Sequence, residues 1–344
     1  MRNKVLLLFL ALVLVLVPLF AGCPKPAPPP APPPPAPPPA PPPAPPPAPP
    51  PWSPTKTIIW IVPYSPGGGF DTLSRGIARI MPKYLPKEVP IVIKNTPGAG
   101  GRTGTNALYR SKPDGYTIGI LNIQGLIVSE MVMETKYDLS KFVYLGRVAT
   151  DTYLAVVPKD SPYRSVEDLQ KAEKPLRLGL TGKGSSAWVV NTIACSVMEI
   201  PTAPVTGYPG TADIIAGALR GELDIIMRPV STELPYIESG DFVPIFVIAH
   251  ERDESVPDVP TVKELGYPEI AGLGLPRFVA APPGTPKEIA DILEKALRDT
   301  LHDESFIAWA ETAKHHLAPL TGEQAEAMLL ELRKPLEKYK EILE

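Results

Sequence analysis

Hydrophobic and polar positions along residues 55–344 follow two periods that alternate along the chain. Short apolar runs rich in Val and Ile predict buried strands, and these lie at 57–62, 89–94, 116–121, 154–157, 177–180, 224–227, 243–249 and 278–281. Segments with apolar residues three to four positions apart predict helices, at 72–84, 103–110, 186–197, 212–220 and 261–265. The alternation predicts an α/β protein with mostly parallel sheets covered on both faces. The length allows two such sheets, and ligands of such sheets bind beyond the carboxyl ends of the strands.

Two short motifs predict where further helices begin. Ser165-x-x-Asp168 and Thr321-x-x-Gln324 have the spacing of capping boxes. In such a box the first side chain accepts a hydrogen bond from the backbone N–H three residues later. We therefore expect a short helix after Ser165 and the last long helix after Thr321.

The first 23 residues have the pattern of an export signal. Residues 1–4 carry Arg2 and Lys4, residues 5–17 are apolar without interruption, and Cys23 follows Ala-Gly. This pattern is typical of secretion signals, and a cysteine after Ala-Gly resembles the lipobox of bacterial lipoproteins. We expect residues 1–22 to be a cleaved signal peptide and Cys23 to be the lipidated N-terminus. The alternative is an uncleaved anchor helix over 5–23, almost long enough to span a bilayer.

Residues 23–54 are expected to form a linker between the lipidated cysteine and the folded part. Residues 24–54 contain 22 of the 48 prolines of the chain. Repeated Ala-Pro-Pro-Pro favours polyproline II, and at about 3.1 Å per residue the segment reaches on the order of 90 Å. A ligand for an SH3-type domain is the rival interpretation, which export from the cytoplasm disfavours.

Charge and cysteine content exclude several classes of protein. Lys and Arg total 34 and Asp and Glu total 37, which gives a net charge of −3, and no basic stripe indicates nucleic-acid binding. Any bound anion must therefore be held by local donors. Cys23 and Cys195 are the two cysteines, so lipidation of Cys23 leaves no disulfide. Cys195 lies in an apolar helical run and is expected to be a buried small hydrophobe.

Two glycine-rich loops carry the candidate chemistry. They span 63–71 and 96–104, each between a predicted strand and a predicted helix, and their glycines are Gly67, Gly68, Gly69, Gly98, Gly100, Gly101 and Gly104. Glycine lets a backbone approach a ligand closely, and free N–H groups at a helix start attract an anion. Two such loops on one sheet favour binding, with two ligand-free tight turns as the alternative.

Other kinds of site find little support in the sequence. The segment 98–104 misses the dinucleotide fingerprint by one position, so no cofactor is expected. The four histidines lack the spacing of metal ligands, and His315-His316 is expected on a solvated helix end. No Gly-x-Ser-x-Gly elbow is present. Ser185 and Ser186 are interpreted as anion donors at a helix start, so we expect neither a catalytic residue nor a metal.

Seven motifs occur in a fixed order along residues 55–344. They are VPYSPGGGFD at 62–71, NTPGAGG at 95–101, PDGYT at 113–117, YPG at 208–210, GELD at 221–224, VPTVKELGYP at 259–268 and PPGTP at 282–286. Their order and spacing resemble the substrate-binding proteins of tripartite tricarboxylate transporters, the Bug family. The resemblance covers nearly all of residues 55–344.

This resemblance implies a two-domain periplasmic-binding-protein fold of type II, a hinged Venus flytrap. Domain 1 would comprise 55–152 and 279–344, and domain 2 would comprise 153–278. The resemblance also implies capture of a small organic carboxylate between the domains and its delivery to a membrane permease. From the export signal and Cys23 we expect the protein to be extracytoplasmic and lipid-anchored. A secreted enzyme or sensor-partner domain on the same fold is the alternative function, because fold does not fix function.

The resemblance also implies which residues line the cleft. The glycine loops would form one wall, which assigns Tyr64, Ser65, Gly67, Gly68, Gly69, Asp71, Gly98, Ala99, Gly100, Gly101, Arg102 and Thr103. The other wall would use the loop and the turn that match Gly184, Ser185, Ser186, Tyr208, Gly210 and Thr211.

Departures from the family pattern predict a ligand different from the better-known dicarboxylates. Phe70 and Arg228 are among them. Arg228 follows the predicted strand 224–227 and would face the ligand side, where a guanidinium can bind a carboxylate. A surface arginine bridging to Glu233 is the alternative. Asp71 would either complement the helix dipole or accept a hydrogen bond from the ligand.

Overall fold

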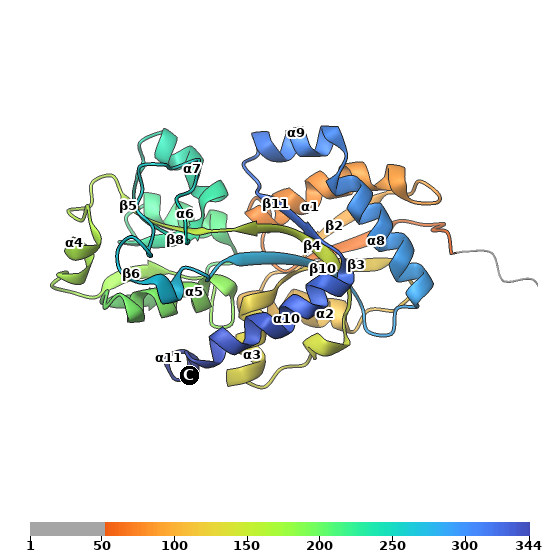
Figure 1. Cartoon of the computed structure of the whole chain (residues 1–344), viewed down its shortest axis with the longest axis horizontal. Coiled ribbons are helices and arrows are strands. Elements are labelled where there is room, and N and C mark those ends of the chain that lie inside the picture. Colours follow the sequence, from red (N-terminus) through yellow and green to blue (C-terminus); the bar gives the residue numbers. More distant parts are fainter. Residues whose placement is uncertain (1–51) are drawn as a thin grey trace, which may run out of the picture. The chain divides into compact units, whose positions relative to one another are not determined.

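The computed structural model describes residues 52–344. The predicted signal peptide (1–22), Cys23 and the linker up to residue 51 lie outside the described residues. The described strands and helices form two lobes, which Figure 1 shows side by side and joined by long strands.

A six-stranded sheet forms the centre of the first lobe. Its strands are β1 (Ile58–Val62), β2 (Ile91–Asn95), β3 (Thr117–Asn122), β4 (Val143–Asp151), β10 (Leu275–Ala281) and β11 (Leu317–Leu320), in the order β11-β4-β10-β3-β1-β2. β1 runs parallel to β2 and β3. β10 is antiparallel to β3 and β4, and β11 is antiparallel to β4.

Helices cover both faces of this sheet. They are α1 (Gly69–Ile80), α2 (Arg102–Tyr109), α3 (Ile123–Val132), α8 (Lys287–Leu301), α9 (Glu304–Thr312), α10 (Gly322–Glu337) and α11 (Lys340–Leu343). Figure 1 shows α1, α8 and α9 on one side of the sheet and α2, α3 and α10 on the other. In α1, Leu73, Ile77 and Ile80 are buried, because their spacing of three to four residues places them on one helix face.

The second lobe contains two smaller sheets and four helices. Its elements are β5 (Tyr153–Pro158), α4 (Val166–Gln170), β6 (Leu176–Gly179), α5 (Ser186–Val197), β7 (Thr202–Val205), α6 (Thr211–Leu219), β8 (Ile226–Pro229), α7 (Val230–Glu238) and β9 (Phe242–Ile248). β5 pairs antiparallel with β8 and β9, and β6 pairs parallel with β7. Short 3₁₀ helices elsewhere span Met81–Tyr84, Ala99–Gly101, Leu139–Lys141 and Pro268–Ile270.

Two extended segments connect the lobes. β4 ends at Asp151 and β5 begins at Tyr153, so the chain leaves the first sheet and enters the second with one residue between them. β10 leads back into the first sheet between β3 and β4. The boundary between the lobes therefore lies near residue 152 and near the start of β10.

The two-lobed α/β fold predicted from the sequence is confirmed. Parallel pairing holds for β1 with β2 and β3 and for β6 with β7, whereas the strands that connect the lobes pair antiparallel with their neighbours. The helix predicted at 261–265 is wrong. Thr261 begins a single turn that Leu265 N closes on Thr261 O, and Gly266 then takes φ +94°, so the chain leaves the helical region.

Both predicted caps are confirmed. Ser165 Oγ accepts from Asp168 N at 3.2 Å, and Thr321 forms a full capping box with Gln324. Cys195 is buried in α5, and burial raises the pKa of its thiol to about 12. It is therefore the buried apolar residue that the sequence predicted.

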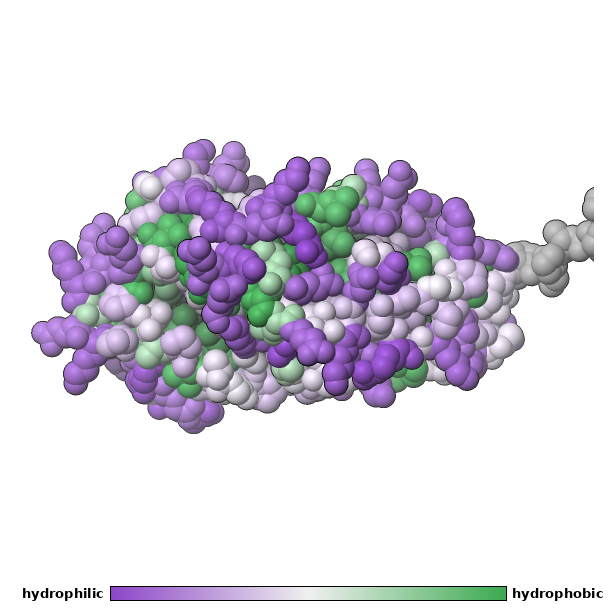
Figure 2. Space-filling model, turned by 90° about the horizontal axis from the view of Figure 1, so that it is seen from below, coloured by the Kyte–Doolittle hydropathy of each residue, from purple (hydrophilic) through white to green (hydrophobic). Residues whose placement is uncertain are grey.

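The surface of the described part is mainly polar. Figure 2 shows hydrophilic side chains over most of one face, with smaller apolar areas between them. The large apolar side chains that stand exposed are Val92, Leu219, Leu330 and Ile342. Within residues 52–344, no helix combines the length and the apolar character needed to cross a bilayer.

Candidate functional site

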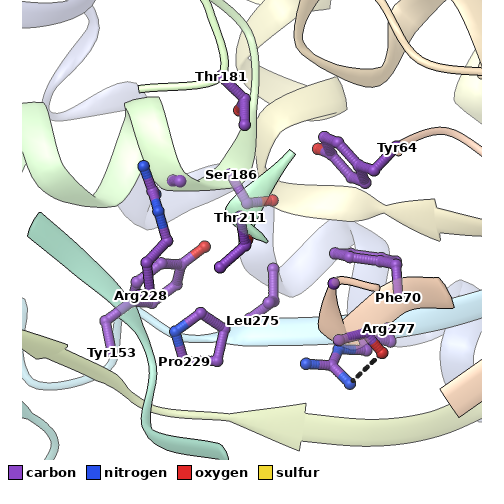
Figure 3. A pocket seen from close by; sticks show the side chains of 13 residues that line it. Tyr64, Phe70, Tyr153, Thr181, Ser186, Thr211, Arg228, Pro229, Leu275 and Arg277 are labelled. Atoms are coloured by element: carbon purple, nitrogen blue, oxygen red, sulfur yellow. Dashed lines mark hydrogen bonds between the residues drawn. The ribbon is translucent and has the colours of Figure 1, made fainter. Parts of the chain in front are cut away.

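A cavity of about 30 Å³, here called the central cavity, lies between the two lobes. Figure 3 shows Arg228 and Tyr153 on one side of it and Tyr64 and Phe70 on the other. Its lining residues are Tyr64, Gly68, Gly69, Phe70, Tyr153, Thr181, Ser186, Ala187, Thr211, Arg228, Pro229, Leu275 and Arg277.

Two larger cavities adjoin the central cavity through shared lining residues. The outer cavity, of about 290 Å³, lies under the second glycine loop and shares Tyr64 and Thr181. The side cavity, of about 260 Å³, shares Gly68, Gly69 and Thr211. The three cavities follow the boundary between the lobes, where the sequence analysis expected the cleft.

The first turns of three helices reach the central cavity. Gly69 and Phe70 begin α1, Ser186 and Ala187 begin α5, and Thr211 begins α6. Amides in a first turn have no acceptor within their helix. Each helix also brings positive partial charge to its N-terminus. Three such ends around one cavity form a strong anion-attracting environment.

The first glycine loop presents free backbone donors. Among residues 52–344, the N–H groups of Gly68, Gly69 and Phe70 donate to no acceptor, whereas Gly67 N donates to Asp71 Oδ2 at 2.9 Å. Gly67 takes φ +84°, which glycine adopts without strain. The loop thus turns sharply and leaves three donors at the cavity wall.

The second glycine loop folds around one of its own carbonyl groups. Gly101 N and Thr103 N donate to Gly98 O at 3.0 and 3.3 Å. A Cβ atom at Gly100 would lie 2.7 Å from Ser185 N on the opposite lobe, closer than real Cβ contacts. Gly100 therefore lets the backbones of the two lobes touch beside the outer cavity.

Arg228 is buried in the second lobe, with 1% of its surface exposed. It lies inside β8, opposite Leu154 of β5, and not beyond a strand end as the sequence predicted. Its Nη1 donates to Met227 O at 3.1 Å and its Nη2 donates to Gly179 O. The alternative of a surface bridge to Glu233 is wrong, because Glu233 is fully buried and its oxygens accept no hydrogen bond within residues 52–344.

Arg277 is a cavity residue that sequence reasoning missed. It is fully buried on β10, forms an ion pair with Asp151 and donates from Nη1 to Gly69 O at 3.2 Å. Its guanidinium also lies 5.2 Å from the ring centroid of Phe70. The sequence does place an arginine directly before the apolar run 278–281, which could have marked it as a candidate. Its partner Asp151 is 126 positions away, so nothing in the sequence indicated that the two would pair.

The carboxylate of Asp71 accepts hydrogen bonds from groups of the protein itself. Its Oδ2 accepts from Gly67 N and Arg75 Nε, both at 2.9 Å, and its Oδ1 accepts from Asn95 Nδ2 at 2.9 Å. Burial alone would raise the pKa of this carboxyl, but the hydrogen bonds from Arg75, Gly67 and Asn95 outweigh burial and lower it. Asp71 lines none of the three cavities. The geometry favours its role at the start of α1 over contact with a ligand.

The structure brings most of the other predicted residues to the cleft. The following line at least one of the three cavities: Tyr64, Gly67, Gly68, Gly69, Gly98, Ala99, Gly100, Gly101, Ser186, Tyr208, Thr211 and Arg228. Six predicted residues besides Asp71 line none of them: Ser65, Arg102, Thr103, Gly184, Ser185 and Gly210.

Some of these six residues hold the cleft together. Ser65 Oγ donates to Asp213 Oδ2 on the opposite lobe at 3.0 Å. Ser185 Oγ accepts from Trp188 N at 3.0 Å and so caps α5. Arg102 Nε donates to Ala99 O at 3.0 Å within the second glycine loop. Their contacts shape the walls and leave the cavity surface to their neighbours.

His315 was expected on a solvated helix end, and that expectation is wrong. Its ring is buried, with Nε2 3.1 Å from Thr72 Oγ1 and Nδ1 3.5 Å from Arg277 Nη1. Burial, together with Arg277, lowers the pKa of His315 to about 3, so the imidazole is neutral at pH 7. In the described part of the chain, no three His, Cys, Asp or Glu side chains are grouped to hold a metal ion.

Two lobes joined by extended strands, with a donor-rich cavity between them, define the class of two-lobed solute-binding proteins. The sequence profile described as "Tripartite tricarboxylate transporter family receptor" matches residues 73–342. The chain therefore belongs to this family of transporter receptors, as the sequence motifs indicated. Membership in the family implies an extracytoplasmic location.

Three similar proteins illustrate the relationship. Protein BugT of Bordetella pertussis is 28% identical over 267 residues, which are 74% of this chain and 79% of BugT. The solved structure of the periplasmic binding protein BugD is 24% identical, with a TM-score of 0.78 over 84% of this chain and 98% of BugD. MatC from Rhodopseudomonas palustris with bound malate is 24% identical, with a TM-score of 0.76 over 85% of this chain and all of MatC, 100%. The two structures establish the shared fold.

Proposed function

We propose that this protein captures a small organic carboxylate in the central cavity and delivers it to a membrane permease. One observation carries the proposal. The first turns of α1, α5 and α6 and the guanidinium of Arg228 surround one cavity whose lining contains no Asp or Glu. Free amides and an arginine are the donors that carboxylates prefer in proteins. The malate held by MatC, which shares the fold, agrees with this chemistry.

The same proposal assigns motion to the two lobes. We infer that 55–152 with 279–344 and 153–278 move as two domains about the segment between β4 and β5 and about β10. The hydrogen bond from Ser65 to Asp213 and the contact of Gly100 with Ser185 cross the cleft. These contacts break when the lobes separate, so the structure corresponds to the closed state of that motion.

We further propose that Cys23 is lipidated after removal of 1–22 and that the proline-rich linker holds the lobes away from the membrane. The charged start, the apolar run and the Ala-Gly-Cys sequence of residues 1–23 support this assignment. Replacing Cys23 with Ser removes the thiol that would be acylated. We expect C23S to appear in the soluble fraction, or unprocessed, where the wild-type protein is membrane-bound. An intact mass that shows an uncut, unmodified wild-type N-terminus contradicts this assignment.

The binding proposal is tested by replacing Arg228 with Gln. Loss of a charged hydrogen bond to a carboxylate costs about 2 kcal/mol or more, which corresponds to a roughly 30-fold weaker Kd. Titration calorimetry with a panel of carboxylates at two salt concentrations measures this loss, and the melting temperature reports whether the fold survives.

Arg252 provides the matched control. It is an exposed arginine that pairs with Glu264 at 3.0 Å, and it lines none of the three cavities. R252Q removes the same charge, and we expect wild-type affinity. Unchanged affinity in R228Q would place anion recognition on the amides alone, and absence of carboxylate binding by the wild-type protein would overturn the proposal.

A further inference from the structure

The three cavities contain few charged side chains. Arg228 and Arg277 are the charged residues that line the central cavity. The outer cavity is lined by none, and the side cavity has His315, whose imidazole is neutral at pH 7. The charge that a ligand meets is therefore set by the two arginines and by the acids that contact them.

The positive charge of Arg277 is compensated by a neighbouring acid. Its guanidinium forms an ion pair with Asp151, and both side chains are buried, at 0% and 1% exposure. Ser231 Oγ also donates to Asp151 Oδ1 at 3.3 Å. Burial raises the pKa of Asp151, but the Arg277 charge opposes that rise. A buried pair in direct contact is close to neutral, so Arg277 adds little net charge to the cavity.

Arg228 is equally buried but, among residues 52–344, forms no ion pair of the kind that joins Arg277 to Asp151. Its two hydrogen bonds go to the uncharged carbonyl groups of Met227 and Gly179. Glu233 is the nearby acid, but its carboxyl oxygens accept no hydrogen bond from any residue in the range 52–344. An ionised carboxylate without donors is very costly to bury, and burial raises the pKa of Glu233 well above its ordinary value. The Arg228 charge opposes this rise, but no ion pair joins the two side chains among residues 52–344. Burial thus favours the neutral form of Glu233, and no ion pair compensates the charge of Arg228.

Among the residues that line the three cavities, a second carboxylate on the ligand would find no cation without an acidic partner, because Arg277 is already paired with Asp151. In the outer cavity, the second glycine loop uses Gly101 N and Thr103 N for its own carbonyl at Gly98. The apolar walls of the central cavity, formed by Phe70, Leu275 and Pro229, also disfavour a charge. Burial of an unpaired carboxylate costs several kcal/mol.

We propose that the ligand is a monoanion, a small monocarboxylate whose remaining part is uncharged. The inference rests on the proposed function and narrows it. One uncompensated guanidinium and three helix N-termini hold a single carboxylate, and the rest of the ligand occupies the apolar part of the central cavity and the uncharged outer cavity.

Matched acids of equal length test the proposal on the full-length protein. Titration calorimetry compares butyrate with succinate, hexanoate with adipate, and benzoate with terephthalate. Among the pairs that bind, we expect the monocarboxylate to bind at least 10-fold more tightly than its dicarboxylate. Equal or tighter binding of the dicarboxylates overturns the inference and leaves the proposed function intact. Absence of binding by all six acids overturns both.

Removal of the compensating acid supplies a second, independent test. D151N leaves the charge of Arg277 uncompensated, so we expect the ratio of dicarboxylate to monocarboxylate affinity to rise at least 10-fold. The double variant D151N/R277Q removes both charges, and we expect it to restore the wild-type preference. R252Q is the control and leaves the ratio unchanged. A ratio that stays constant in a folded D151N protein contradicts the charge assignment, and if D151N does not fold, the wild-type panel alone decides.

Discussion

Substitution of Gly100 by Ala tests whether the lobes must touch for ligand to be held. The new Cβ would lie 2.7 Å from Ser185 N and 2.8 Å from Lys183 O, where ordinary contact begins at 3.4 Å. The lobes would have to separate locally by about 0.7 Å, and both obstacles are backbone atoms that cannot rotate away. Gly100 also takes φ +67°, which costs an alanine about 1 kcal/mol.

These two costs act on different equilibria. The cost of positive φ applies whether the lobes are open or closed, so it lowers the free energy of unfolding without changing closure. The overlap exists only in the closed state, and overpacking of this kind costs about 1–3 kcal/mol. Since 1.4 kcal/mol corresponds to a factor of ten in Kd, we expect G100A to bind ligand roughly 5- to 150-fold more weakly.

Gly240 supplies the control for backbone strain. It takes φ +78°, and a Cβ there would have no heavy atom within 4 Å. G240A should therefore lose about 1 kcal/mol of stability with unchanged affinity. Urea unfolding and titration calorimetry separate the two effects, and small-angle scattering reports closure on ligand addition. Wild-type affinity and full closure in G100A would refute the requirement for contact between these backbones.

Two further predictions concern the first glycine loop. Gly68 has extended backbone angles, and a Cβ there would lie 3.8 Å from Thr211 Cβ. We therefore expect G68V to fold with a near-native melting temperature but to lose ligand binding, because the valine methyl groups fill the cavity. Retained affinity would show that the loop is only a turn. The pKa of Asp71 in the folded protein lies below its ordinary value. The ionised carboxylate therefore stabilises the folded protein at pH values above the pKa of Asp71 in the unfolded chain, which is near 4. This stabilisation is lost as the pH falls through the pKa of the folded protein. Urea unfolding should show D71N to be less stable than wild type at pH 7, with a smaller difference at pH 3. A difference independent of pH would contradict the role of the carboxylate.

The sequence determined features that depend on neighbouring residues. The capping motifs at Ser165 and Thr321 and the turn at Gly67 act within a few positions of the chain, so their spacing was sufficient to place them. The alternation of strands and helices predicted an α/β fold for the same reason, and the family resemblance implied its two lobes. The shared motifs identified the family before any contact was known.

Only the tertiary structure decided which side chains form the cavity. Arg277 and Asp151 lie far apart in the sequence and meet because β10 pairs with β4 in the first sheet. Arg228 is buried because β8 lies inside the second lobe, although a strand followed by Arg-Pro also suits a surface position. Asp71 accepts a hydrogen bond from Asn95 at the end of β2, which holds its carboxylate within the protein. These positions depend on how segments far apart in the sequence pack together. The hydrophobic periodicity of one segment predicts its own helix or strand, but it does not predict which side chains of another segment will contact it.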